Sequence, residues 1–175
     1  MLFDVPFVSQ YADLGRHEWR ARGCGIASLK MVLDFYGTHI LLEELLSVGL
    51  ELGAYREGIG WSHGGLVSIA ERYGYRGYNA DWGPKSSNPK TAPGAWDALM
   101  SELAHGPVLA SVHAGFDAER PGGHIVAITG YADGLVLLND PEQMHEREGR
   151  RALALDAFLK AFKRRYIVIR PTALP

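Results

Sequence analysis

The chain of 175 residues contains one cysteine, no long apolar run and almost no net charge. A single cysteine excludes an internal disulfide, so we expect a reducing compartment, the cytoplasm. No apolar segment approaches the length of a membrane-spanning helix, and residues 1–6 lack the basic flank of a secretory signal. The formal net charge of −2 gives no electrostatic indication of nucleic-acid binding.

Hydrophobic residues make up 47% of the chain, which is typical of a globular protein. The length suits one domain, residues 1–175, with a full core. Basic residues gather late in the chain, and we interpret them as a solvated helix face and strand edge. They are Arg147, Arg150, Arg151, Lys160, Lys163, Arg164 and Arg165.

Apolar residues follow helical spacing early in the chain and form β-branched runs later. The spacing predicts helices at residues 25–36, 41–52, 64–73, 96–105 and 155–162. The runs predict strands at residues 107–112, 125–131, 135–139 and 166–170. This order predicts an α+β fold, with a helical half (about 1–105) packed on an antiparallel sheet half (about 106–175). The polar stretch 79–95 is expected to be a loop, either beside the groove between the halves or a surface insertion.

Cys24 occupies the start of the first predicted helix and has a glycine on each side. The positive end of a helix stabilises negative charge, and thiolate is the nucleophilic form of cysteine. The glycines are expected to leave the sulfur uncovered. The first-turn N–H of Cys24 can donate to an oxyanion, and Gln10 is the second candidate donor. Cys24 is therefore the candidate nucleophile.

His124 is the candidate base for that thiol. It begins the most apolar predicted strand and follows two glycines that leave room around its ring. Burial and pairing with a thiolate would set its protonation. His113, at the end of the preceding predicted strand, is the alternative.

A carboxylate is expected from the next strand, where Asn139 and Asp140 are both candidates. A two-residue hairpin loop at 133–134 would place Asn139 on the face of His124, whereas a three-residue loop at 132–134 would place Asp140 there. We predict the longer loop, because glycine is preferred at its last position. Asp140 is then expected to fix the orientation of the imidazole.

Four segments, in this order, resemble the bacteriocin-processing, double-glycine-leader peptidases of the papain-like clan and their stand-alone relatives. They are Val5-Pro6-Phe7-Val8-Ser9-Gln10, Gly23-Cys24-Gly25-Ile26-Ala27-Ser28-Leu29-Lys30-Met31, Gly123-His124-Ile125-Val126-Ala127-Ile128-Thr129-Gly130-Tyr131 and Leu138-Asn139-Asp140-Pro141.

The resemblance implies a papain-like α+β fold. It also implies a nucleophile at Cys24, a base at His124, its orienting partner at Asp140 and an oxyanion donor at Gln10. The expected activity is cleavage of a peptide or amide bond in a peptide or protein through a thioester on Cys24.

Two other functions fit parts of the sequence. Gly60-Trp61-Ser62-His63-Gly64 matches a nucleophile elbow, which would make Ser62 the nucleophile of a serine hydrolase, but residues 54–59 are a poor buried strand. A non-catalytic peptide-binding module on the same fold is the other alternative. We expect no metal and no cofactor, because no paired cysteines or His-Glu-x-x-His spacing occur.

Overall fold

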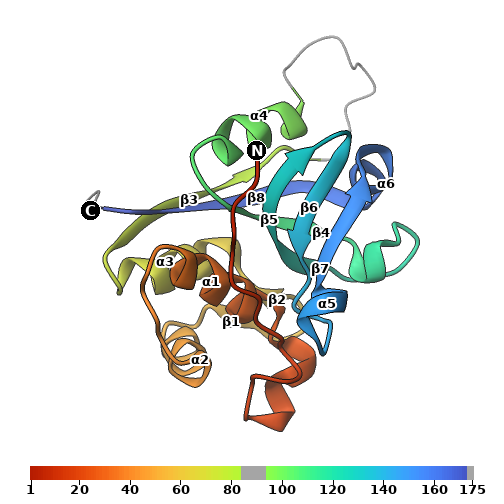
Figure 1. Ribbon diagram of the computed structural model, residues 1–175. Helices are drawn as coiled ribbons and strands as arrows, with labels where there is room; N and C mark the ends of the chain where they lie inside the picture. Colours follow the sequence, from red (N-terminus) through yellow and green to blue (C-terminus); the bar gives the residue numbers. More distant parts are fainter. Residues whose placement is uncertain (84–93, 173–175) are drawn as a thin grey trace.

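The computed structural model describes residues 1–83 and 94–172, and a six-stranded antiparallel sheet dominates it (Figure 1). The strand order is β3-β8-β4-β5-β6-β7. These strands are β3 (Tyr75–Asp81), β4 (Val108–Val112), β5 (His124–Ala132), β6 (Leu135–Asn139), β7 (Arg150–Ala154) and β8 (Phe162–Pro171). A separate short hairpin consists of β1 (Tyr55–Arg56) and β2 (Gly60–Trp61).

Helices pack on both faces of this sheet (Figure 1). One face carries α1 (Cys24–Phe35), α2 (Leu42–Glu51) and α3 (His63–Glu71), and the other carries α4 (Ala95–Leu103) and α6 (Leu155–Ala161). Shorter turns are η1 (His17–Arg22), η2 (Ala114–Phe116) and α5 (Glu146–Gly149). Among the described residues, no helix combines the length and the apolar character needed to cross a bilayer.

The central strands contribute to two hydrophobic cores. Leu109 and Ile125 face the core under α1–α3, whereas their neighbours Val108 and Val126 face the core under α4 and α6. A strand that is buried on both faces has a continuous apolar sequence. This explains why the sequence predicted strands at β4, β5 and β6, and these predictions are confirmed.

Both edge strands were missed. No strand was predicted for residues 75–81, which lie in the half expected to be helical, yet β3 pairs with β8 from Tyr75↔Pro171 to Asp81↔Arg165. Edge strands face solvent on much of their surface, so β3 and β7 lack the apolar pattern of a buried strand. The expected loop at 79–95 therefore begins inside a strand and ends at the start of α4, and residues 84–93 lie outside the described part of the chain.

The hairpin between β5 and β6 corrects the predicted loop. The loop has two residues, Asp133 and Gly134, both with positive φ (51° and 78°), and not three. The extra residue is instead a bulge at Thr129. On the other side of this bulge from the loop, Ala127 pairs with Asn139. This one-residue shift gives the register that the three-residue loop would have given, so Asp140 is on the side of His124 for a different reason.

Candidate active site

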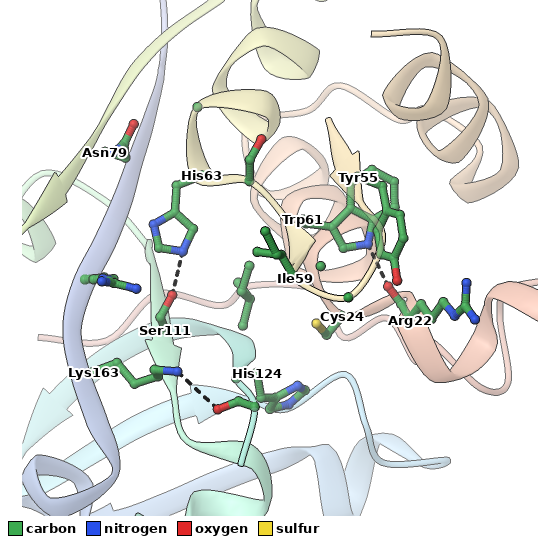
Figure 2. A pocket seen from close by; sticks show the side chains of 18 of the residues that line it. Arg22, Cys24, Tyr55, Ile59, Trp61, His63, Asn79, Ser111, His124 and Lys163 are labelled. Atoms are coloured by element: carbon green, nitrogen blue, oxygen red, sulfur yellow. Dashed lines mark hydrogen bonds between the residues drawn. The ribbon is translucent and has the colours of Figure 1, made fainter. Parts of the chain in front are cut away.

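A pocket of about 660 Å³ opens between the α1–α3 layer and the sheet (Figure 2). Its walls come from the start of α1, the β1–β2 hairpin, the start of α3 and one end of β3, β4, β5 and β8. Cys24 and His124 both line it and lie near each other on neighbouring walls (Figure 2). A thiol on a helix and an imidazole on a strand thus border the same pocket.

Cys24 is the first residue of α1 and is half-buried. The chain reaches it through the 3-10 turn η1 and Gly23, which is the N-cap of α1. The first amides of an α-helix have no intrahelical acceptor, and the helix dipole is positive at this end. The Cys24 sulfur and N–H therefore lie where negative charge is stabilised.

The glycines beside Cys24 have a packing role that the sequence did not indicate. A Cβ atom on Gly25 would lie 2.8 Å from the Trp61 side chain, and one on Gly23 would lie 3.1 Å from Cβ of Gln10. The Trp61 indole is held in place by donating from Nε1 to the Arg22 carbonyl oxygen at 2.6 Å. The glycines therefore let Trp61 and Gln10 pack against the helix start, in addition to any exposure of the sulfur.

Ser28 holds α1 against the strand that carries the imidazole. Its buried hydroxyl donates to the carbonyl oxygen of Ile125 at 2.9 Å. Ser28 lies one helical turn after Cys24, and Ile125 directly follows His124. This hydrogen bond, together with the apolar packing of α1 on β5, holds the segments that carry the two candidate catalytic residues together.

His124 begins β5, opposite Val112 of β4, and its side chain is buried. Its Nε2 lies 2.7 Å from Oδ1 of Asp140, which leaves Nδ1 as the ring nitrogen for the thiol. Burial lowers the pKa of His124, but bonding and charge from Asp140 and Cys24 outweigh burial and raise the pKa to about 10. The site therefore favours the imidazolium form, which in turn stabilises a thiolate.

Asp140 is buried and has several polar partners besides His124. Oδ2 accepts from Arg151 Nη1 at 2.8 Å and from Gln143 Nε2 at 3.3 Å, and Oδ1 accepts from the Glu142 N–H at 3.1 Å. Burial raises the pKa of Asp140, but the bonds to His124, Arg151 and the Glu142 N–H lower it to about 2. Asn139, the alternative candidate, instead donates to the Val5 carbonyl oxygen at 3.0 Å.

Gln10 lies against the turn that precedes Cys24. Its Nε2 donates to the Arg20 carbonyl oxygen at 2.8 Å, and its backbone N–H donates to the Pro141 carbonyl oxygen at 2.9 Å. Gln10 thus connects the turn after Asp140 with the turn before Cys24. The Gln10 side chain is buried, and Gln10 is not among the residues that line the pocket.

The two remaining candidates are Ser62 and His113. Ser62 caps α3 by accepting from the Gly65 N–H at 3.2 Å, and its hydroxyl donates to the Ala54 carbonyl oxygen at 3.1 Å. His113 follows β4 and is not among the residues that line the pocket. Neither of these bonds joins Ser62 to a base that could activate it, and His113 lies outside the pocket that contains Cys24.

His124, Asp140 and Glu142 are also the one group of potential metal ligands found among the described residues, with ligand atoms within 4.8 Å of one another. They do not suit a cation well. His124 and Asp140 already form a hydrogen bond with each other, and the positively charged Arg151 side chain binds the other oxygen of the Asp140 carboxylate.

The sequence interpretation of the late basic residues was correct for Arg147, whose side chain is 92% exposed, and wrong for Arg151 and Lys163. Arg151 binds Asp140, and its guanidinium lies 4.3 Å from the ring centroid of Phe116. Lys163 lines the pocket. Only the pairing of β7 with β6 brings Arg151 to the carboxylate, and β7 was not predicted.

Several solved protease structures have a fold similar to that of this chain. A double glycine motif protease from an AMS/PCAT transporter, solved with its leader peptide, is 21% identical; the alignment covers 98% of this chain and 94% of that one, with a TM-score of 0.65. The peptidase domain of Streptococcus ComA, a bi-functional ABC transporter, is 16% identical; the alignment covers 87% of this chain and 93% of that one, with a TM-score of 0.62. A Bacillus anthracis protein assigned as a C39-like peptidase is 18% identical; the alignment covers 98% of this chain and 96% of that one, with a TM-score of 0.67.

No curated protein matches the chain in sequence. The sequence pattern that defines the Peptidase_C39 like family does match, over residues 2–174. The predictions of a papain-like α+β fold and of a cysteine peptidase-like hydrolase are thereby confirmed. The chain belongs to the Peptidase_C39 like family.

Proposed function

We propose that this protein is a peptidase that cleaves a peptide bond through a thioester on Cys24, with His124, Asp140 and Gln10 as the other participants. The observation that supports it most is the buried bond of 2.7 Å between His124 and Asp140, on a ring that borders the Cys24 sulfur. A carboxylate on one ring nitrogen holds the imidazole in the orientation that presents the other nitrogen to the thiol.

In the first half of the reaction, the Cys24 thiolate attacks the carbonyl carbon of the scissile bond. The carbonyl oxygen becomes an oxyanion, which accepts hydrogen bonds from the Cys24 N–H and the Gln10 amide. The His124 imidazolium then gives its Nδ1 proton to the leaving nitrogen. The carbon–nitrogen bond breaks, the amine product leaves, and the acyl group remains on the sulfur.

In the second half, neutral His124 takes a proton from water as that water attacks the thioester carbon. The carbon–sulfur bond breaks, the acid product leaves, and the thiolate–imidazolium pair forms again. Asp140 stays ionised throughout, in agreement with its lowered pKa. Its role is to orient and stabilise the imidazolium.

A peptide substrate and a cytoplasmic location are part of this proposal. The double glycine motif protease of similar fold was solved with a leader peptide, which supports a peptide substrate here. A mechanism that needs the chain's one thiol in reduced form suits a reducing compartment. The contacts of Ser62 give no support to a serine hydrolase.

The proposal is tested by incubating the protein with a peptide library and reading the cleavage products by mass spectrometry. We expect cleavage by the wild type and none by Cys24→Ala. A Ser62→Ala variant should keep measurable turnover, which separates the thiol mechanism from the serine alternative. Turnover that survives in Cys24→Ala would end the proposal.

A further inference from the structure

The pocket extends past Cys24 to a polar end that the proposed chemistry does not use. His63, Ser111 and Lys163 line this end, on the opposite side of the pocket from Tyr55 and Arg22 (Figure 2). They come from α3, β4 and β8, so three separate elements direct polar side chains into one place. We call His63, Ser111 and Lys163 the polar subsite.

Lys163 brings a positive charge that no carboxylate neutralises within 4 Å among residues 1–83 and 94–172. The nearby carboxylate of Asp81 is already paired with Arg165, Oδ2 to Nε at 2.9 Å. The ammonium of Lys163 has one neutral partner, the Gly122 carbonyl oxygen at 3.1 Å. Two of its three N–H donors therefore remain for a ligand in the pocket.

The Lys163 ammonium lies beside the two glycines that precede His124. It is bound by the Gly122 carbonyl oxygen, and a Cβ atom on Gly123 would lie in ordinary van der Waals contact with it, at 3.4 Å. The room beside His124 that the sequence suggested is thus bordered by the Lys163 side chain. A substrate bound at Cys24 and His124 would pass next to this charge.

His63 and Ser111 add a neutral donor. Nε2 of His63 lies 2.7 Å from Oγ of Ser111. Burial and the positive charges of Arg165 and Lys163 lower the pKa of His63, against the opposing charge of Asp81. The ring is therefore uncharged at neutral pH, and the pair presents an N–H or an O–H without adding an acidic or basic group.

We infer that the polar subsite binds the carboxylate of an acidic residue in the substrate, close to the scissile bond. This inference rests on the proposed function. An ammonium with two available N–H groups and a neighbouring neutral donor suits a carboxylate, and it disfavours a basic side chain by like-charge repulsion. The aromatic residues at the other end of the pocket would contact a different part of the peptide.

The test uses fluorogenic octapeptides with a central Gly-Gly pair, in which one flanking position at a time is Glu, Gln or Lys. We expect the wild type to prefer Glu over Gln at one position by about tenfold in kcat/KM, and less at high salt. Lys163→Met should abolish this preference, and Lys163→Glu should reverse it in favour of Lys. Lys160→Met removes an exposed lysine outside the pocket and should leave the preference unchanged.

Binding of the same peptides to Cys24→Ala and Cys24→Ala/Lys163→Met, followed by fluorescence anisotropy, separates this inference from the proposed function. Glu-selective binding that depends on Lys163, without cleavage by the wild type, would support the subsite and defeat the peptidase proposal. Cleavage with no Glu preference would overturn the subsite alone. Neither cleavage nor Lys163-dependent binding would overturn both.

Discussion

Replacing Asp140 by asparagine should destabilise the protein by an amount that depends on pH. Asparagine keeps the shape of the side chain but removes the charge that binds His124 and Arg151. The pKa of Asp140 is lowered from 3.8 to about 2. At 1.36 kcal/mol per unit, this shift corresponds to about 2 kcal/mol of folding free energy. The raised pKa of His124 reflects the same bond to Asp140 and also the neighbouring Cys24, so its energy is not added.

The sign of the effect follows from the two pKa shifts. A lowered carboxyl pKa stabilises the fold above pH 3.8, and this contribution disappears as the pH falls toward 2. A raised histidine pKa stabilises the fold below pH 6.5, and this contribution disappears as the pH rises toward 10. The difference between wild type and Asp140→Asn should therefore be greatest between pH 4 and 6.5.

Urea unfolding at pH 3, 5.5 and 9 measures this difference. For a pKa moving from 3.8 to 2, it should be about 1 kcal/mol smaller at pH 3 than at pH 5.5, and it should also shrink at pH 9. Asp133→Asn is the control: Asp133 is exposed, and its φ of 51° suits asparagine. A difference for Asp140→Asn that does not change with pH would refute the reasoning.

Two further substitutions test the surroundings of the site. In a thermal unfolding assay, Gly25→Ala should destabilise the fold by about 1–3 kcal/mol, because its Cβ atom would lie 2.8 Å from the Trp61 side chain. Gly64→Ala is the control: its Cβ atom has its nearest contact at 3.8 Å, so it should cost less than about 0.5 kcal/mol. Equal losses of stability in the two variants would contradict this prediction. Arg151→Met should move the acid limb of the pH profile of kcat/KM upward, because a cation that lowers the pKa of the buried carboxyl is removed. The exposed Arg147→Met should leave that limb in place, and an unmoved limb in both variants would count against a role for Arg151.

Much of the fold could be predicted because its central strands are buried on both faces and its first helices have regular apolar spacing. The edge strands β3 and β7 could not, since solvent contact removes the apolar pattern that marks a strand. The fold class depends on the first kind of element. The position of Arg151 depends on the second, because β7 pairs with β6. Lys163 lies in the first part of β8, before the predicted strand at 166–170, where the register with β4 shifts between Ser111 and Val112.

The candidate site illustrates how local and long-range information differ. Cys24 and His124 could be proposed from their places at the start of a helix and a strand. Asp140 was proposed from a hairpin loop of the wrong length, and a bulge at Thr129 restores the register. That bulge accepts a hydrogen bond from the Phe3 N–H at 2.8 Å. A contact between the N-terminal segment and residue 129 cannot be predicted from the hairpin sequence alone.

The central claim is that His124 activates the thiol of Cys24, and the alkylation rate of that thiol tests it most directly. The chain has one cysteine, so the intact mass after iodoacetamide treatment reports Cys24 alone. At pH 6 we predict that His124→Asn slows alkylation at least about tenfold, because the imidazolium no longer stabilises the thiolate. The exposed His105→Asn should react like the wild type. Equal rates for wild type and His124→Asn would contradict the account.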